Sequence, residues 1–333
     1  EEDLYEELLR SHGYDNIPIY KPKPGPINKN RQVNILDKLK LGFVYFGFNE
    51  LMHMPFVSRD SFQKLNSNGW TAAELKNPIN ENESLLRGSL FKLLFTAVNT
   101  NVKKGYTSIK VFEAGNVFKK AKNGFIQSLH LSGIVYNHEP QQTWSQKKLD
   151  YNFFSLKAEI SKLFQTLGKQ NIKFQKASSV KPFNENALEI YADKQKIAVI
   201  GEIDLSVTDK LLKKPALGFE MYPEKISLDS DNPKIKKTSK FPLSTRDINL
   251  VIDESISFKE IEELINKEAI KFLASYSLIN TFKGKDIPKG SVSMTLRFIF
   301  QSNVKSLLES EINDSMQKTL KLFEKKLNAK IRT

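Results

Sequence analysis

The sequence predicts an α+β protein of two domains, a largely antiparallel sheet with flanking helices followed by a smaller β-α-β-β-α-β domain. Predicted strands outnumber predicted helices, and short hairpin-like connections join most neighbouring strands. A charged stretch without apolar periodicity, residues 229–240, divides the chain. Its 333 residues are enough for two domains, since a domain usually has roughly 100–200 residues.

The first 28 residues are predicted to be the end of a helical module and a linker. Leu4, Leu8 and Leu9 share one face of a helix over 3–12, and Gly13 is placed to end it. The proline-rich stretch "IPIYKPKPGPIN" (17–28) follows, and proline disfavours helix both at its own position and at the residue before it. The chain opens without Met, so we expect it to be a piece of a longer protein.

Residues 29–228 are predicted to form the larger domain. Apolar residues recur at steps of three and four over 31–46, 84–100 and 151–167, which predicts three amphipathic helices. Strands are predicted at 49–57, 109–120, 128–137, 173–177, 187–192, 196–204 and 216–222.

Residues 241–333 are predicted to form the smaller domain. Ile248, Leu250 and Ile252 alternate with polar residues in its first strand, and Ser257 with Glu260 forms a capping box at the following helix. Further elements are predicted in the order strand 275–282, strand 291–301, helix 308–327 and closing strand 329–332. The order β-α-β-β-α-β is that of a ferredoxin-like domain.

The sequence lacks the common signatures of catalysis and metal binding. Without cysteine there is no thiol chemistry and no Cys-based zinc site. Glycine-rich phosphate loops and the G-x-S-x-G motif are also missing. The four histidines show no metal-ligand spacing: His12, His53, His130 and His138. We expect no catalytic residue and no metal site, and we interpret His130 as a structural residue of a strand.

No apolar run approaches the roughly 18–20 residues that a membrane span needs. The acidic start, Glu1 to Asp3, does not resemble a secretory signal. A soluble, cytoplasmic protein without membrane contact is therefore expected.

The formal charge of +13 is spread along the chain, since residues 240–333 carry 16 Lys/Arg and 12 Asp/Glu. A diffuse positive field suits a polyanion such as RNA, although a generally lysine-rich composition would give the same charge.

The ferredoxin-like pattern raises the possibility of RNA binding on its open sheet. The outward face of the third strand offers Ser293, Thr295, Arg297, Ile299 and Gln301 but no aromatic residue, and the phenylalanines are expected to point inward. Base stacking is therefore disfavoured, and contacts to phosphates are expected instead. The candidate RNA-binding cations are Arg246, Lys283, Lys285, Lys289 and Arg297. The alternative is that the loop lysines are simply solvated.

Several segments resemble one known family in collinear order. "FPLSTRDINLVID" (241–253), "TFKGKDIPKGSVSMTLRFIFQ" (281–301) and "AKIR" (329–332) resemble the anticodon-binding domain of bacterial phenylalanyl-tRNA synthetase β subunits. The segments that resemble the preceding helical module and the core of that subunit are "EELLRSHGYDNIP" (6–18), "NPINENESLLRGSLF" (77–91), "VFEAGNVF" (111–118) and "GEIDLSV" (201–207).

The resemblance implies a class II synthetase-like core that has lost catalysis. The motif containing Glu113 has Val111 where a phosphate-gripping arginine would stand, and 216–226 has no arginine. The resemblance further implies that ATP and Mg²⁺ are used by the catalytic α subunit and that this fragment binds neither. The partners implied are that α subunit, in an (αβ)₂ heterotetramer, and tRNA(Phe). The helix 31–46 and the strand with Pro55 would pack against α.

Two points stay open at this stage. Arg246 and Asp247 are a family signature at the start of the anticodon domain and point to opposite faces of their strand, but their separate roles are undecided. A free-standing, non-catalytic paralogue that binds RNA or protein is the alternative function. A single-chain organellar synthetase is disfavoured by the missing arginines, and the editing module of the family lies outside these residues.

Overall fold

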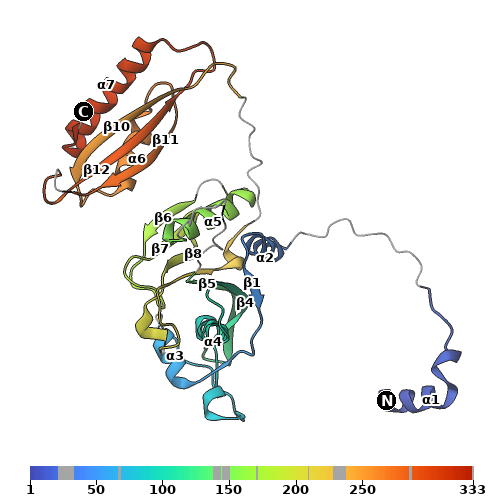
Figure 1. The fold of residues 1–333 in the computed structure, drawn as a ribbon. Helices are drawn as coiled ribbons and strands as arrows, with labels where there is room; N and C mark the ends of the chain where they lie inside the picture. Colours follow the sequence, from blue (N-terminus) through green and yellow to red (C-terminus); the bar gives the residue numbers. More distant parts are fainter. Residues whose placement is uncertain are drawn as a thin grey trace. The chain divides into compact units, whose positions relative to one another are not determined.

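The computed structural model describes residues 1–21, 34–66, 69–137, 144, 151–169, 172–208, 210–227, 238–284 and 287–331. The chain divides into two compact units, Glu1–Pro233 and Lys234–Thr333 (Figure 1). In the part of the chain that the structure describes, no helix is long and apolar enough to cross a bilayer.

The first unit is built on one large, mostly antiparallel sheet with the strand order β1-β4-β5-β9-β8-β7-β6. Its centre is the hairpin of β4 (Ile109–Lys120) and β5 (Phe125–Tyr136), paired along twelve residues. β1 (Asn49–Leu51) pairs with β4 in parallel. The other strands are β6 (Lys173–Lys176), β7 (Leu188–Ala192), β8 (Gln195–Glu202) and β9 (Ala216–Met221).

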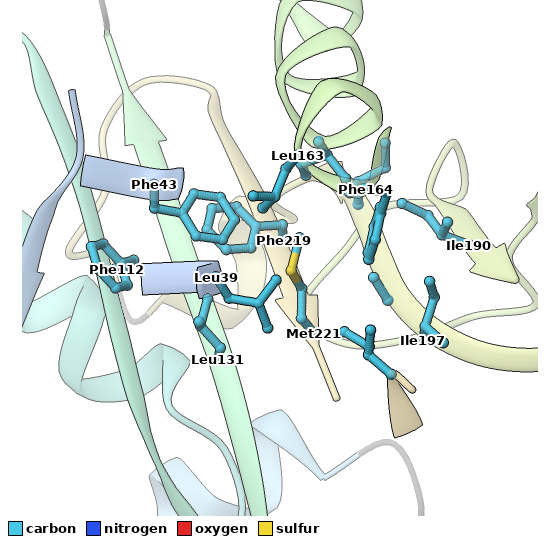
Figure 2. Packing of buried hydrophobic residues seen from close by; sticks show 14 of the residues in the cluster. Leu39, Phe43, Phe112, Leu131, Leu163, Phe164, Ile190, Ile197, Phe219 and Met221 are labelled. Carbon is cyan, nitrogen blue, oxygen red and sulfur yellow. The ribbon is translucent and has the colours of Figure 1, made fainter. Parts of the chain in front are cut away.

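Helices pack on both faces of this sheet. Successive side chains of a strand point to opposite faces, and apolar side chains lie on each of the two faces. α2 (Ile35–Tyr45) and α5 (Phe153–Thr166) pack on the face that includes Phe112 and Phe219. In Figure 2, Phe43 of α2 stacks on Phe219, with ring centroids 4.3 Å apart. α4 (Phe91–Lys103) packs on the opposite face, which includes Val111. Fully burying a side chain of this size contributes roughly 1.5–3 kcal/mol, so these contacts hold the three helices against the sheet.

The predicted strand 49–57 and helix 84–100 were both wrong in detail. The strand breaks at 52–55 into β1 and β2 (Phe56–Val57), and Pro55 in the break has no N–H to donate to a ladder. The helix begins only at Phe91, because Leu85–Leu86 form strand β3 and pair with β2. A short apolar run fits a helix or a strand equally well, and tertiary pairing decided here. A helix that was not predicted, α3 (Arg59–Leu65), follows β2.

The second unit has the predicted β-α-β-β-α-β order. β10 (Ser244–Asp253), β11 (Leu273–Phe282), β12 (Ser291–Phe300) and β13 (Lys330–Ile331) form an antiparallel sheet in the order β11-β12-β10-β13. α6 (Phe258–Glu268) and α7 (Glu309–Leu327) cover one face of it (Figure 1). The capping box of Ser257 and Glu260 is present, as predicted.

The N-terminal segment contains α1 (Glu2–His12) and a 3₁₀ turn at Tyr14–Asn16. Gly13 has φ of 86° and separates the two, which agrees with the predicted helix end. Most of the two predicted linkers, 17–28 and 229–240, lies outside the described residues.

Candidate functional site

The face of the second unit that α6 and α7 leave uncovered is a polar, hydrogen-bonded surface. Ile248, Leu250 and Ile252 of β10 point into the core, so Asp247 and Asn249 lie on the other, open face. Residues directly opposite in an antiparallel pair share a face, and the register places Thr295 and Arg297 of β12 beside Asn249 and Asp247. This confirms the alternation predicted for the first and third strands.

Arg297 and Asp247 form a bidentate ion pair on the open face. The Arg297 Nε and Nη2 atoms donate to Asp247 Oδ1 and Oδ2 over 2.8 and 2.7 Å. These hydrogen bonds hold the pKa of Asp247 below its ordinary value. Nearby, Thr295 Oγ1 donates to Asn249 Oδ1 over 2.7 Å. The bidentate contact with the Asp247 carboxylate therefore orients the guanidinium of Arg297 on the open face.

Arg246 lies on the opposite face from Asp247. Its Nη2 lies 3.4 Å from Glu309 Oε1 at the start of α7. The two residues of the signature thus have separate roles: Asp247 orients Arg297 on the open face, and Arg246 connects the first strand to the last helix.

The structure brings together only some of the predicted RNA-binding cations. Lys283 and Lys289 lie in the loop between β11 and β12, and Lys283 Nζ is 2.7 Å from Glu254 Oε2 at the end of β10. Arg246 pairs in register with Phe298, seven residues along β12 from Ser291, and so lies roughly 20 Å from this loop. Lys285 lies outside the described residues.

Phe282 overturns the expectation that all phenylalanines of this domain point inward. It is 48% exposed and pairs in register with Ser293, which places it on the open face beside Asn280 and Thr295. Simple alternation from Leu278 would have placed it inward, but a register shift between Leu278 and Asn280 reverses the faces of the residues that follow. Such a bulge has no clear sequence signal.

An apolar strip lies on the exposed side of α2 in the first unit. Leu39 and Phe43 face the core, whereas Leu41, Val44 and Tyr45, spaced at three and four residues, form an exposed apolar row. Met52 and Met54, in the segment after β1, are 91% and 75% exposed. We call these five residues the apolar strip; exposed apolar side chains gathered on neighbouring elements are typical of a protein–protein interface.

Glu113 belongs to a buried network. Its carboxylate is 2.6 Å from Arg87 Nη1 and 2.7 Å from His53 Nδ1, and it also accepts the His53 backbone N–H. Burial alone would raise the pKa of Glu113, but hydrogen bonds from His53 and Arg87 outweigh burial and lower it. A Cβ at Gly115 would collide with Arg87 Nη2, so a larger residue there would require this guanidinium to move.

Glu113 therefore has a structural role, because its carboxylate is held between Arg87 and His53. Val111, where the resemblance would place an arginine, is buried under α4. The histidine interpreted as structural, His130, has its Nδ1 3.0 Å from Glu220 Oε1, which satisfies that nitrogen.

Two family models match the chain in collinear order. The "Phenylalanyl tRNA synthetase beta chain CLM domain" matches residues 16–222, more than half of the chain. The "Ferredoxin-fold anticodon binding domain" matches residues 239–332. The chain belongs to the phenylalanyl-tRNA synthetase β-chain family. The resemblance and the α+β fold class predicted from the sequence are thereby confirmed.

Curated relatives in the phenylalanyl-tRNA synthetase β-chain family match over the whole chain. The phenylalanine–tRNA ligase β subunits of Buchnera aphidicola subsp. Baizongia pistaciae and Carboxydothermus hydrogenoformans are 27% and 29% identical over 100% of this chain. That of Syntrophus aciditrophicus is 26% identical over 99%. The chain spans 42% to 43% of the length of these relatives. Among solved structures, pyrrolysyl-tRNA synthetase from Desulfitobacterium hafniense is similar over 57% of this chain and 66% of its own, with 14% identity and a TM-score of 0.44.

Proposed function

We propose that this chain is the C-terminal part of a phenylalanine–tRNA ligase β subunit, which holds the catalytic α subunit in an (αβ)₂ assembly and binds tRNA(Phe). The assembled enzyme would join phenylalanine to tRNA in the cytoplasm, with ATP and Mg²⁺ used at the α subunit. Residues 29–228 would be the non-catalytic core and 241–333 the anticodon-binding domain, preceded by a module end (1–28) and separated by a linker (229–240). The relatives' names support this function.

The observation that carries the scaffold role is the apolar strip of Leu41, Val44, Tyr45, Met52 and Met54. Its residues come from α2 and from the segment around Pro55, the elements that the resemblance assigns to the α-subunit interface. Aromatic residues and methionines are enriched in the buried centres of interfaces.

The experiment that tests the scaffold role is the native mass of this chain co-expressed with the α subunit from the same genome. A stable complex with equal numbers of α and β chains is expected. A chain that stays apart from α, both as this piece and in the full-length subunit, would contradict the scaffold role and favour the free-standing paralogue.

The RNA-binding role would use the open face of the second unit. Phe282 offers a ring on which one unpaired base can stack, and Asn249 and Thr295 offer hydrogen-bonding groups nearby. Lys283 and Lys289, in the loop that follows Phe282, are placed to contact the backbone of the same strand. The proposed interface therefore combines base stacking on Phe282 with the phosphate contacts that were predicted from the sequence.

Phe282→Ala is expected to weaken tRNA(Phe) binding by roughly 1–3 kcal/mol, or about 5- to 150-fold, because one stacking platform is lost. The matched control is Val304→Ala, an exposed apolar residue of the same unit outside its sheet. Fluorescence anisotropy with labelled tRNA and the αβ complex measures both variants. Equal affinities would remove Phe282 from the interface.

Charge reversal at Lys283 and Lys285 together is expected to weaken tRNA binding at moderate salt and to reduce the salt dependence of binding by about one phosphate contact for each lysine. The Lys283–Glu254 pair is exposed on both sides, so its loss costs little stability. The control reverses the charges of Lys259 and Lys267 on α6. This variant has the same net charge as the first, but its changes lie on the side of the sheet away from the open face. A salt titration that matches this control would exclude a local contact.

A further inference from the structure

The face of the core sheet that packs against α4 is apolar at one end and polar at the other. The register aligns Glu113, Ser132 and Glu220 across three strands, and it aligns Gly115 with His130. Toward Ile109 and Ala216 this face is buried under α4. Toward Lys119 and Tyr222 it is left open, and the side chains there are polar.

A cleft of about 430 Å³ lies over this polar end, which is within the size range of small-molecule sites. Trp70 and Tyr222 form part of its wall, with His130 and Glu220 beside them. Side chains on β4, β5, β8 and β9 contribute, so the cleft is positioned by the sheet.

Four lysines line this cleft: Lys119, Lys181, Lys196 and Lys225. Only Lys196 has a carboxylate partner among the described residues, since its Nζ lies 2.9 Å from Glu189 Oε1. The Nζ of Lys119 lies over the ring of Trp70 at 5.1 Å, and that of Lys225 lies over the ring of Tyr222 at 4.6 Å. Three ammonium groups without a carboxylate partner therefore line one cleft.

Among the described residues, the two acidic residues that line the cleft form no ion pair with Lys119, Lys181 or Lys225. Glu220 is 8% exposed, and its two carboxylate oxygens contact His130 Nδ1 and the Tyr222 hydroxyl, at 3.0 and 3.2 Å. Glu224 lies at the exposed rim. Like charges that face one cleft repel one another, and a bound anion relieves this repulsion. The carboxylates remain available as acceptors for ligand hydroxyl groups.

We infer that this cleft binds an organic phosphate of nucleotide size, with the phosphate held by Lys119, Lys181 and Lys225 and the hydroxyl groups held by Glu220 and Glu224. This site lies in the core and does not depend on docking of the α subunit or on the open face of the last domain. A free nucleotide and the 5′-phosphorylated end of an RNA strand share this chemistry.

The test is calorimetric titration of the chain alone with inorganic phosphate, AMP and a short 5′-phosphorylated RNA at low salt. Saturable binding with one site per chain is expected, and AMP should bind more tightly than inorganic phosphate. Tighter binding of AMP than of the RNA would identify a free nucleotide as the ligand, and the reverse order would identify an RNA end. Either order supports the site.

The double variant K119Q/K225Q is expected to weaken AMP binding at least tenfold and to lower the melting temperature only slightly. Each lysine loses a contact with one aromatic ring, and neither has an ion-pair partner among the described residues. The matched control is K173Q/K176Q on β6, two exposed lysines outside the cleft. If the wild-type chain shows no saturable binding at millimolar ligand, or if the control loses as much affinity as K119Q/K225Q, the inference is wrong. AMP binding no tighter than phosphate binding would overturn the role given to Glu220 and Glu224.

Discussion

Replacing Arg87 with methionine is expected to lower the free energy of unfolding of the core unit by about 3–5 kcal/mol. Arg87 and Glu113 are 4% and 1% exposed, and their charged atoms are 2.6 Å apart. Methionine fills a similar volume but leaves the Glu113 carboxylate buried, with His53 as its remaining side-chain hydrogen-bond partner among the described residues. The effect is large because an uncompensated buried charge costs more than the pair contributes.

Denaturant unfolding followed by circular dichroism measures this loss. The matched control is Arg59→Met, which breaks an exposed pair with Glu74 of similar length, 2.8 Å, and is expected to cost no more than about 1 kcal/mol. The second unit is a separate compact body, so its own transition should not move in either variant. If both variants lower the free energy of unfolding by the same amount, burial does not make the Arg87–Glu113 pair more important for stability than an exposed pair.

The same network gives the core a defined pH dependence. The pKa of Glu113 in the folded chain lies below its ordinary value of 4.5, so between these two values the unfolded chain binds more protons. The stability that Glu113 contributes is therefore fully present above about pH 4.5 and is lost as the pH falls through its folded pKa. The difference in stability between wild type and Glu113→Gln should be largest near neutral pH and shrink in acid. A difference that does not change with pH would contradict this assignment.

The elements that the sequence predicted well are those determined by neighbouring residues. α6 is an example, because Ser257 and Glu260 form its cap and its apolar face repeats within a few turns. The order of strands in the last domain was likewise predicted from alternation. By contrast, the start of α4 was predicted wrongly because Leu85 and Leu86 pair with a strand nearly 30 residues earlier.

The site was harder to predict because its geometry depends on contacts distant in sequence. Arg87 and His53 meet Glu113 from 26 and 60 residues away, which no local spacing encodes. Phe282 changed faces through a bulge, and Asp247 paired with an arginine 50 residues on. The cations of the last domain were identified as residue types, but the sequence did not show that they lie at two ends of a sheet.

Introducing aspartate at both Leu41 and Tyr45 is expected to abolish assembly with the α subunit. If these side chains are central to the interface, each contributes about 2 kcal/mol or more, so the pair would lower affinity at least about 1000-fold. A charge placed in a desolvated interface adds a further penalty. The side chains are 56% and 85% exposed in this chain, so its own stability should change by no more than about 0.5 kcal/mol.

The matched control places aspartate at Tyr106 and Phe125, which are 60% and 55% exposed on the same unit but outside α2. Native mass spectrometry of chains co-expressed with α compares the two double variants at equal expression. If the control variant still binds the α subunit and the variant at Leu41 and Tyr45 does not, the interface lies on the apolar strip. If both variants retain α, the strip has another role. The apolar character of helix α2 would then be explained by Leu39 and Phe43 alone, because these residues of its opposite side pack in the core.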